Sequence, residues 1–282
     1  MLDAHAHLIS GDLDRYPPAP VDGELDPAIF QNPMTVERLL AEMDATGVDQ
    51  ALLVQRGSIY GFDCSYVSDC AELHSDRLRA VCSIDATSPT AADDVTHWVR
   101  ERGAVGIRLM ELVKGSDIGW LDSPIARNVW QQAASLNVPV CVHLFPWNRV
   151  EGLTRLATIL ADIPGLTVVI DHLAAIRSDA GPPDHGVDEL LATVAAHEGV
   201  NVKFTTIPLG RLEAAGVDAR PVLRRVADLF GTERMLWGSD ITQSPGTYEY
   251  MVGLGRHAVS EFSSDEQDRL LGGTARRVYN IG

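Results

Sequence analysis

Eight short apolar runs alternate with helix-like segments along the whole chain, and this alternation restricts the fold more than any other feature. The runs are rich in β-branched residues and nearly continuous, which is typical of parallel strands covered on both faces. Between them, apolar residues recur with helical spacing, as in Val187, Leu190, Leu191 and Val194. The sequence therefore predicts eight strands, at residues 1–8, 50–55, 78–84, 104–109, 139–144, 166–171, 200–204 and 235–238.

Eight strands that alternate with helices are the number required by a closed (β/α)8 TIM barrel, an α/β fold with its active site at the C-terminal strand ends. An open doubly wound sheet is the rival, but it usually carries a glycine-rich turn after its first strand. No linker or shift in composition divides the chain, so we predict a single barrel domain over residues 1–282. The long loop at 9–33 either packs over the barrel mouth or forms a substrate lid.

The charge balance limits the partners. With 23 Lys and Arg against 39 Asp and Glu, the formal net charge is −16, which repels nucleic-acid phosphates and anionic lipid. We expect neither nucleic acid nor membrane as a partner, whereas a small-molecule substrate, even an anionic one, is compatible with a few inward-facing cations. A homo-oligomer is left open. The scattered cysteines predict reduced, core-packed thiols of a cytoplasmic protein: Cys64, Cys70, Cys82 and Cys141.

Ionisable side chains stand at the ends of four predicted strands. Side chains of a strand alternate between faces, so His5 and His7 should point into the barrel while Ala4 and Ala6 point outward. His143 ends the fifth strand, His172 ends the sixth and Asp240 follows the eighth. We therefore predict an active site at the ends of strands 1, 5, 6 and 8. Clusters of His and carboxylate at such positions can hold a divalent metal with an open water position.

Two cations should face the same interior. By strand parity, Arg108 shares a face with Gly106, and Lys203 shares one with Thr205. A cation in a barrel must be paired, either with an internal carboxylate or with an anionic substrate. We expect Arg108 to bind substrate and leave both pairings open for Lys203. Further substrate-binding candidates at the pocket are Arg56, Tyr60 and Trp147.

Several motifs resemble the amidohydrolase superfamily, in particular its amidohydrolase-2-type branch. That branch includes 2-pyrone-4,6-dicarboxylate lactonase-like and sugar-lactonase-like hydrolases as well as metal-dependent decarboxylases. The resemblance covers nearly the whole chain. Its carriers are Asp3-Ala4-His5-Ala6-His7, Asp14-Arg15-Tyr16-Pro17, Tyr60-Gly61-Phe62-Asp63, Gly106-Ile107-Arg108-Leu109, Asp171-His172-Leu173 and Trp237-Gly238-Ser239-Asp240.

The chain departs from the lactonases at two places. Phe145-Pro146-Trp147 after His143 is closer to the decarboxylases, whose strand-five His is a metal ligand, and strand seven continues with Thr205 where the lactonases usually have Ser-Gly. The resemblance implies one divalent metal, zinc before manganese. A metal-free route stays open because some lactonases of the branch are thought to work that way. The implied ligands are His5, His7, His143 and Asp240.

The resemblance favours hydrolysis of a lactone, with a carboxylated or hydroxylated small molecule as substrate. Asp240 would take a proton from the attacking water, and His172 would donate to the developing oxyanion or to the leaving alkoxide. Non-oxidative decarboxylation at the same site is the alternative, supported by Phe145-Pro146-Trp147. Lactone isomerisation and a barrel that binds a ligand without turnover are weaker alternatives.

Overall fold

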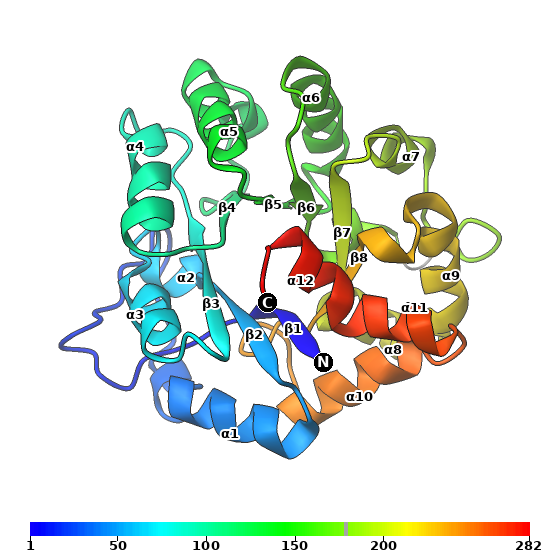
Figure 1. Ribbon diagram of the computed structural model, residues 1–282, viewed down its shortest axis with the longest axis horizontal. Coiled ribbons are helices and arrows are strands. Elements are labelled where there is room, and N and C mark those ends of the chain that lie inside the picture. The colour runs from blue at the N-terminus through cyan, green and yellow to red at the C-terminus, as the bar shows by residue number, and fades with distance from the viewer. Residues whose placement is uncertain (178–179) are drawn as a thin grey trace.

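The structure is a computed structural model that describes residues 1–177 and 180–282, and it contains the predicted barrel. Eight strands pair in chain order, each parallel to the next, and the helices surround them (Figure 1). The strands are β1 (Leu2–Ala6), β2 (Gln50–Val54), β3 (Leu78–Ser83), β4 (Gly106–Met110), β5 (Val140–His143), β6 (Val168–Ile170), β7 (Val200–Thr205) and β8 (Met235–Gly238).

Contacts between β1 and β8 close the ring. The Asp240 N–H donates to the His5 carbonyl at 2.7 Å, and Ala6 forms a parallel bridge with Ile241. The Asp3 carboxylate crosses the same seam and accepts the Ser239 N–H at 2.8 Å. The seam therefore brings the ionisable residues of the first and last strands side by side.

The outer helices begin and end at residues suited to those positions. At the start of α5 (Pro124–Leu136), the Ser123 side chain accepts from the Ala126 N–H, and Asn137 ends the helix in the left-handed conformation. None of the helices in the described ranges is long and apolar enough to cross a membrane. The other helices are α1 (Val36–Thr46), α2 (Gly57–Tyr60), α3 (Ser65–Leu73), α4 (Ala91–Thr96), α6 (Arg149–Asp162), α7 (Glu189–Ala195), α8 (Thr206–Ala214), α9 (Ala219–Phe230), α10 (Tyr248–Ala258), α11 (Ser264–Asp268) and α12 (Thr274–Val278).

A bulge in β1 changes the expected alternation. Asp3 pairs with Ala51, but Ala6, three residues later, pairs with Leu53, only two residues later. The extra residue lets Ala4 join the interior apolar cluster, while Ala6 packs outward against the helices. The prediction that Ala4 points outward is therefore wrong. The prediction that His5 and His7 share the interior face agrees with their contacts.

The opposite end of the barrel is filled by the end of the chain. Tyr279, just after α12, packs with Leu2 and Val169 in the interior cluster, and its hydroxyl lies 2.9 Å from the Cys141 sulfur. Gly106 makes room for this ring, because a Cβ at that position would lie 2.9 Å from the tyrosine Cε1. The bottom of the interior is thus filled mainly by apolar side chains.

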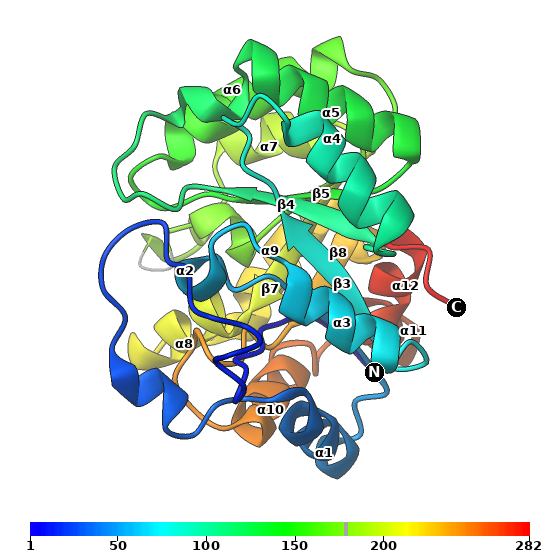
Figure 2. The same cartoon turned by 90° about the vertical axis from the view of Figure 1, so that its left-hand side faces the viewer.

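The segment 9–33 after β1 packs along the side of the barrel next to α2 (Figure 2). The Ala19 N–H donates to the Ile59 carbonyl, and the Ser10 N–H donates to the Tyr60 hydroxyl at 2.8 Å. No residue of this segment is among the described residues that line the cavity at the barrel mouth. Its contacts are those of a packed loop, and nothing in them supports the lid.

Candidate active site

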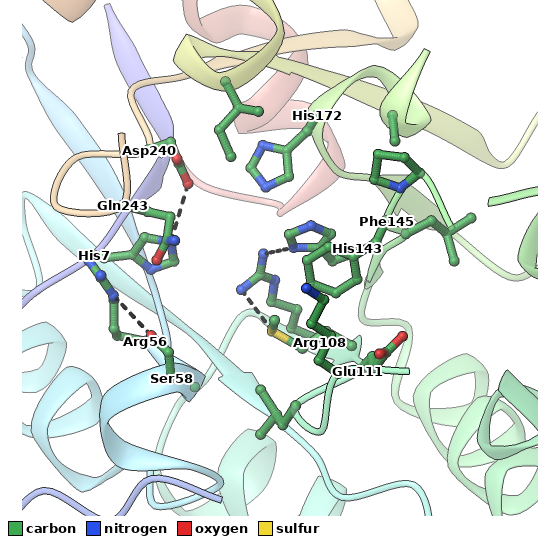
Figure 3. A pocket seen from close by; sticks show the side chains of 18 of the residues that line it. His7, Arg56, Ser58, Arg108, Glu111, His143, Phe145, His172, Asp240 and Gln243 are labelled. Atoms are coloured by element: carbon green, nitrogen blue, oxygen red, sulfur yellow. Dashed lines mark hydrogen bonds and ion pairs between the residues drawn. The ribbon is translucent and has the colours of Figure 1, made fainter. Parts of the chain in front are cut away.

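A cavity of about 480 Å³ opens at the C-terminal ends of the strands. Side chains from most of the strand ends project into it (Figure 3). Of the residues predicted at the site, seven line this cavity: His7, Arg56, Arg108, His143, Trp147, His172 and Asp240.

The β1–β8 wall of the cavity is formed by His7 and Asp240, with the fully buried His5 directly behind them. The Asp240 Oδ1 lies 3.4 Å from His7 Nε2 and 3.6 Å from His5 Nε2. His5 can stand this close to β8 because residue 238 is glycine; a Cβ there would lie 2.5 Å from the His5 Cβ. Burial lowers the pKa of His7 and lowers that of His5 well below its usual value, so both rings are neutral at pH 7.

The donor atoms of this wall suit a metal ion. The His7 Nδ1 lies 2.7 Å from the Val54 carbonyl oxygen, which only accepts, so Nδ1 carries the hydrogen and the Nε2 lone pair faces Asp240. His5 Nε2 and Asp240 Oδ1 are buried and have no hydrogen-bond partner among the described residues. The donor atoms of His5, His7 and Asp240 all lie within 4.8 Å of one another. The His7 lone pair faces the Asp240 carboxylate, and this pair requires a cation or a proton between its atoms. His5 Nδ1 lies 3.3 Å from the donor Lys203 Nζ and 3.4 Å from the acceptor Asp171 Oδ1, so its contacts allow either tautomer.

Asp171 is the residue of this site that the sequence analysis missed. Its carboxylate accepts from Arg108 Nε at 2.9 Å, and its other oxygen lies 3.2 Å from Lys203 Nζ and 3.4 Å from His5 Nδ1. Burial opposes ionisation, but Lys203, His5 and Arg108 outweigh it and hold the pKa of Asp171 well below its usual value. The alternation of side chains along a strand could have predicted this residue, because Asp171 falls on the same interior face as Val169.

Lys203 serves this internal network. Its side chain is fully buried, pairs with Asp171 and is absent from the described residues that line the cavity. Of the two pairings left open by the sequence, these contacts favour the internal carboxylate. The proposed role of Lys203 in substrate binding therefore has no support in its position.

His143 stands apart from the predicted metal ligands. Its Nδ1 lies 2.9 Å from Arg108 Nη2, and its ring stacks on Phe145 with centroids 4.3 Å apart. Neither of the two ligand groups found among the described residues, His5–His7–Asp240 and His5–Asp171–His172, includes it. Burial and the adjacent Arg108 lower the pKa of His143 to about 3.

His172 occupies a left-handed turn directly after β6. Four consecutive residues, His172 through Ala175, have φ between 50° and 54°, a conformation that costs roughly 1–2 kcal/mol per non-glycine residue. Asp240, the other predicted catalytic residue, also has a positive φ, of 60°. The His172 Nδ1 lies 2.6 Å from the Thr205 hydroxyl, which fixes the ring between His5 and His143. Backbone strain of this kind is concentrated at functional sites.

The remaining candidates separate into two groups. Tyr60 is buried, accepts the Ser10 N–H and is absent from the described cavity lining, so its proposed contact with substrate has no support. Arg56 lines the cavity and donates to the hydroxyls of Ser58 and Thr242. Trp147 lies parallel to Phe145 with centroids 4.5 Å apart and remains 54% exposed.

Arg211 and Glu111 are two of the lining residues for which the sequence predicted no role. The Arg211 guanidinium, from α8, lines the cavity and makes no hydrogen bond or ion pair with another described residue. Glu111 is buried after β4 and accepts from the Trp147 Nε1 at 3.2 Å and the Asn148 Nδ2 at 2.5 Å. Glu111 thereby joins the loops after β4 and β5 into one wall.

The sequence is similar to known proteins over almost its whole length. The Amidohydro_2 amidohydrolase family model matches residues 2–281. L-fucono-1,5-lactonase from Burkholderia ambifaria is 28% identical over 295 residues, which cover 99% of this chain and 95% of that protein.

Solved structures give the same fold. A protein from Acinetobacter baumannii, described as a 2-pyrone-4,6-dicarboxylic acid hydrolase and crystallised with citric acid, has a TM-score of 0.77 at 20% identity, covering 99% of this chain and 98% of that one. An amidohydrolase from Burkholderia multivorans with bound zinc has a TM-score of 0.76 at 20% identity, covering 100% and 99%. The barrel is thereby confirmed, and the match of the family model over almost the whole sequence shows that this chain belongs to the amidohydrolase family.

Proposed function

We propose that this protein is a lactonase, which uses water to open the cyclic ester of a small hydroxylated or carboxylated molecule. The observation that carries the proposal is the position of the Asp240 carboxylate. Its Oδ1 is buried beside His5 and His7 and has no hydrogen-bond partner among the described residues. A carboxylate placed in this way can take a proton from an adjacent water. The similarity to L-fucono-1,5-lactonase supports a cyclic ester as the substrate.

A divalent metal ion, zinc before manganese, would be held by His5, His7 and Asp240, whose donor atoms converge. When bound, such an ion polarises a carbonyl oxygen and lowers the pKa of water. Asp171 lies behind His5 in the position of the carboxylate that commonly orients a ligand imidazole. We leave His143 out of the ligand set because Arg108 donates to it.

Hydrolysis at this site needs two proton transfers. The oxygen of water attacks the carbonyl carbon of the ester while Asp240 takes a proton from that water. The bond between the carbonyl carbon and the ring oxygen then breaks, and His172 passes a proton to the ring oxygen as it leaves. The proton taken up by Asp240 is returned to His172, so both side chains end in their starting states. The product is the open-chain hydroxy acid.

Cations at the mouth would bind the rest of the substrate. Arg56 donates only to hydroxyl groups among the described residues, and the Arg211 guanidinium has no partner there. We therefore expect the substrate to carry a carboxylate or several hydroxyls within reach of these side chains. Arg108, by contrast, already donates to Asp171 and His143, so its part in binding the substrate would be secondary.

A lactone panel tests this function. Purified protein, with its metal content measured, would be offered neutral aldonolactones and carboxylated lactones, and release of acid would be followed with a pH indicator. We expect acid release with at least one lactone, its loss in Asp240→Asn, and its retention in the surface control Asp228→Asn. No acid release from any lactone by the metal-loaded protein would contradict the proposal.

Decarboxylation remains the second candidate because the stacked rings of Phe145 and Trp147 offer a flat surface to an aromatic acid. Its test is the release of carbon dioxide from hydroxylated aromatic acids. Carbon dioxide release without acid release from lactones would favour this second reaction.

A further inference from the structure

We propose that His143 is a catalytic hydrogen-bond donor, whose Nε2–H binds the carbonyl oxygen of the substrate, and that Arg108 is the positioning residue that fixes this tautomer. The identity of the oxygen rests on the proposed lactonase reaction. The tautomer follows from contacts within the protein, so the two parts can be tested separately.

The tautomer follows from the chemistry of arginine. A guanidinium has five N–H donors and no acceptor. Its Nη2 lies 2.9 Å from the His143 Nδ1, so this ring nitrogen must accept. The ring is neutral at pH 7, since its pKa is lowered to about 3, and a neutral imidazole carries one hydrogen. That hydrogen is therefore on Nε2.

Neither partner is free to change its orientation. The Arg108 side chain is only 3% exposed, and its Nε donates to the Asp171 carboxylate at 2.9 Å. Its Nη1 lies 3.2 Å from the Met110 sulfur. On the other side, stacking on Phe145 holds the plane of the His143 ring. The buried Asp171 thus sets the direction of the hydrogen bond to His143 through Arg108.

The Nε2–H is available to a ligand. His143 lines the cavity across from His7 and Asp240 (Figure 3), and its Nε2 makes no hydrogen bond with any described residue. The His172 ring is 4.6 Å away, between centroids. A substrate between the walls would meet a proton acceptor at Asp240 and two imidazoles opposite. We assign the carbonyl oxygen to His143 and the leaving ring oxygen to His172.

Kinetics of two variants test the role in catalysis. Loss of one donor to a developing oxyanion typically lowers kcat by ~10²–10³-fold. We expect this loss in His143→Leu, with a small change in KM. His143→Gln can place an amide N–H close to Nε2 and should recover at least tenfold of that loss. His97→Gln, at an exposed ring paired with Glu101, is the matched control and should leave kcat unchanged. Equal losses in the Leu and Gln variants, or a change confined to KM, would overturn the catalytic role.

Nitrogen NMR of histidine-labelled protein tests the tautomer without any substrate. The His143 signals, assigned through His143→Gln, should show a protonated Nε2 in the wild type. Arg108→Lys, which keeps a cation for Asp171, should produce a mixture of tautomers. A protonated Nδ1 in the wild type would overturn the assignment whatever the lactone panel shows.

A zinc titration separates this proposal from a ligand role. His143→Gln should bind zinc as tightly as the wild type, whereas His7→Gln should bind it at least tenfold more weakly. A tenfold or larger loss of zinc affinity in His143→Gln would assign the ring to the metal and end the proposal.

Discussion

The two walls of the cavity present imidazoles of opposite hydrogen-bonding character. On the β1–β8 wall, His7 donates from Nδ1 to a backbone carbonyl, so its lone pair faces the cavity. On the β4–β5 wall, His143 accepts at Nδ1 from Arg108, so its N–H is the group left for a ligand. A histidine therefore offers a lone pair or an N–H to the cavity according to the group that contacts its Nδ1. A list of histidines does not specify a site until those groups are known.

The largest expected effect concerns the acceptor on the β1–β8 wall. Asp240→Asn keeps the size of the side chain but cannot take a proton, and loss of a positioned base typically lowers the rate by ~10²–10⁴-fold. We expect a drop of that order in kcat with a much smaller change in KM. Steady-state kinetics on an active lactone would measure it. Near wild-type turnover would show that the acceptor lies elsewhere, with His172 the next candidate.

The second-largest expected effect concerns Asp171, the carboxylate that faces His5 Nδ1. Asp171→Asn keeps the shape but weakens the carboxylate that faces His5 Nδ1, and such changes typically lower metal affinity by ~10–100-fold. Competition with a zinc chelator would measure it. Asp162→Asn, at an exposed pair with Arg127, is the control. Unchanged zinc affinity in a folded Asp171→Asn variant would show that Asp171 does not support His5 as a metal ligand, and the β1–β8 wall would lose this part of its distinction from the β4–β5 wall.

The sequence predicted the positions of the residues in the two walls, but not the hydrogen bonds that make the walls different. The alternation of apolar runs predicted all eight strands, because parallel barrel strands are buried on both faces. Strand-end position then identified His5, His7, His143, His172 and Asp240, which the fold brings to one end of the barrel. Parity failed at Ala4, because a bulge depends on strand pairing that no local pattern records.

The partners of the interior cations were the second gap. Parity placed Arg108 and Lys203 inside the barrel, but it could not choose between a substrate and an internal carboxylate. The choice depends on whether Asp171 lies at the same height in the barrel as these two cations, which is a property of strand register. Asp171 directly follows β6, which is next to β7 and two strands from β4. The direction of the Arg108 hydrogen bond, and hence the state of His143, follows from that register too.

A smaller effect is expected at the outer edge of the β4–β5 wall. Trp147→Ala removes the exposed ring of the aromatic stack, and an aromatic contact contributes about 0.5–1.5 kcal/mol, or roughly 2–10-fold in KM. The value of kcat should change little, because the ring is 54% exposed and contacts none of the residues assigned to proton transfer. Tyr250→Ala, at an exposed ring on α10, is the control. A large fall in kcat would place the reacting bond nearer to Trp147.

The last expected effect is on stability as a function of pH and not on catalysis. Burial lowers the pKa of His7 and lowers that of His143 to about 3, whereas an unfolded histidine titrates near 6.5. Below pH 6.5 the unfolded chain therefore binds more protons, so these rings stabilise the fold fully above that pH and progressively less as the pH falls towards 3. We expect the free energy of unfolding, measured in urea with chelator present, to fall between pH 7.5 and 5.

Glutamine at each position sharpens the comparison between the walls. Arg108 lowers the pKa of His143 further, whereas Asp240 raises the pKa of His7 and so opposes the effect of burial there. His143→Gln should therefore flatten the dependence on pH at least as much as His7→Gln. A steeper dependence in either variant would contradict the direction of these shifts.

The Tyr279 plug has a consequence for how the chain is made. Tyr279 and Ile281 share one apolar cluster with Leu2, and β1 needs β8 to complete its pairing. During synthesis on a ribosome, β1 emerges long before β8, which is its neighbour on one side, and before α12 and Tyr279, which fill the bottom of the barrel. A nascent chain stopped before α12 exposes the interior ends of the strands to water. Emergence of residues 275–281, rather than of any earlier segment, is then the event that completes the core.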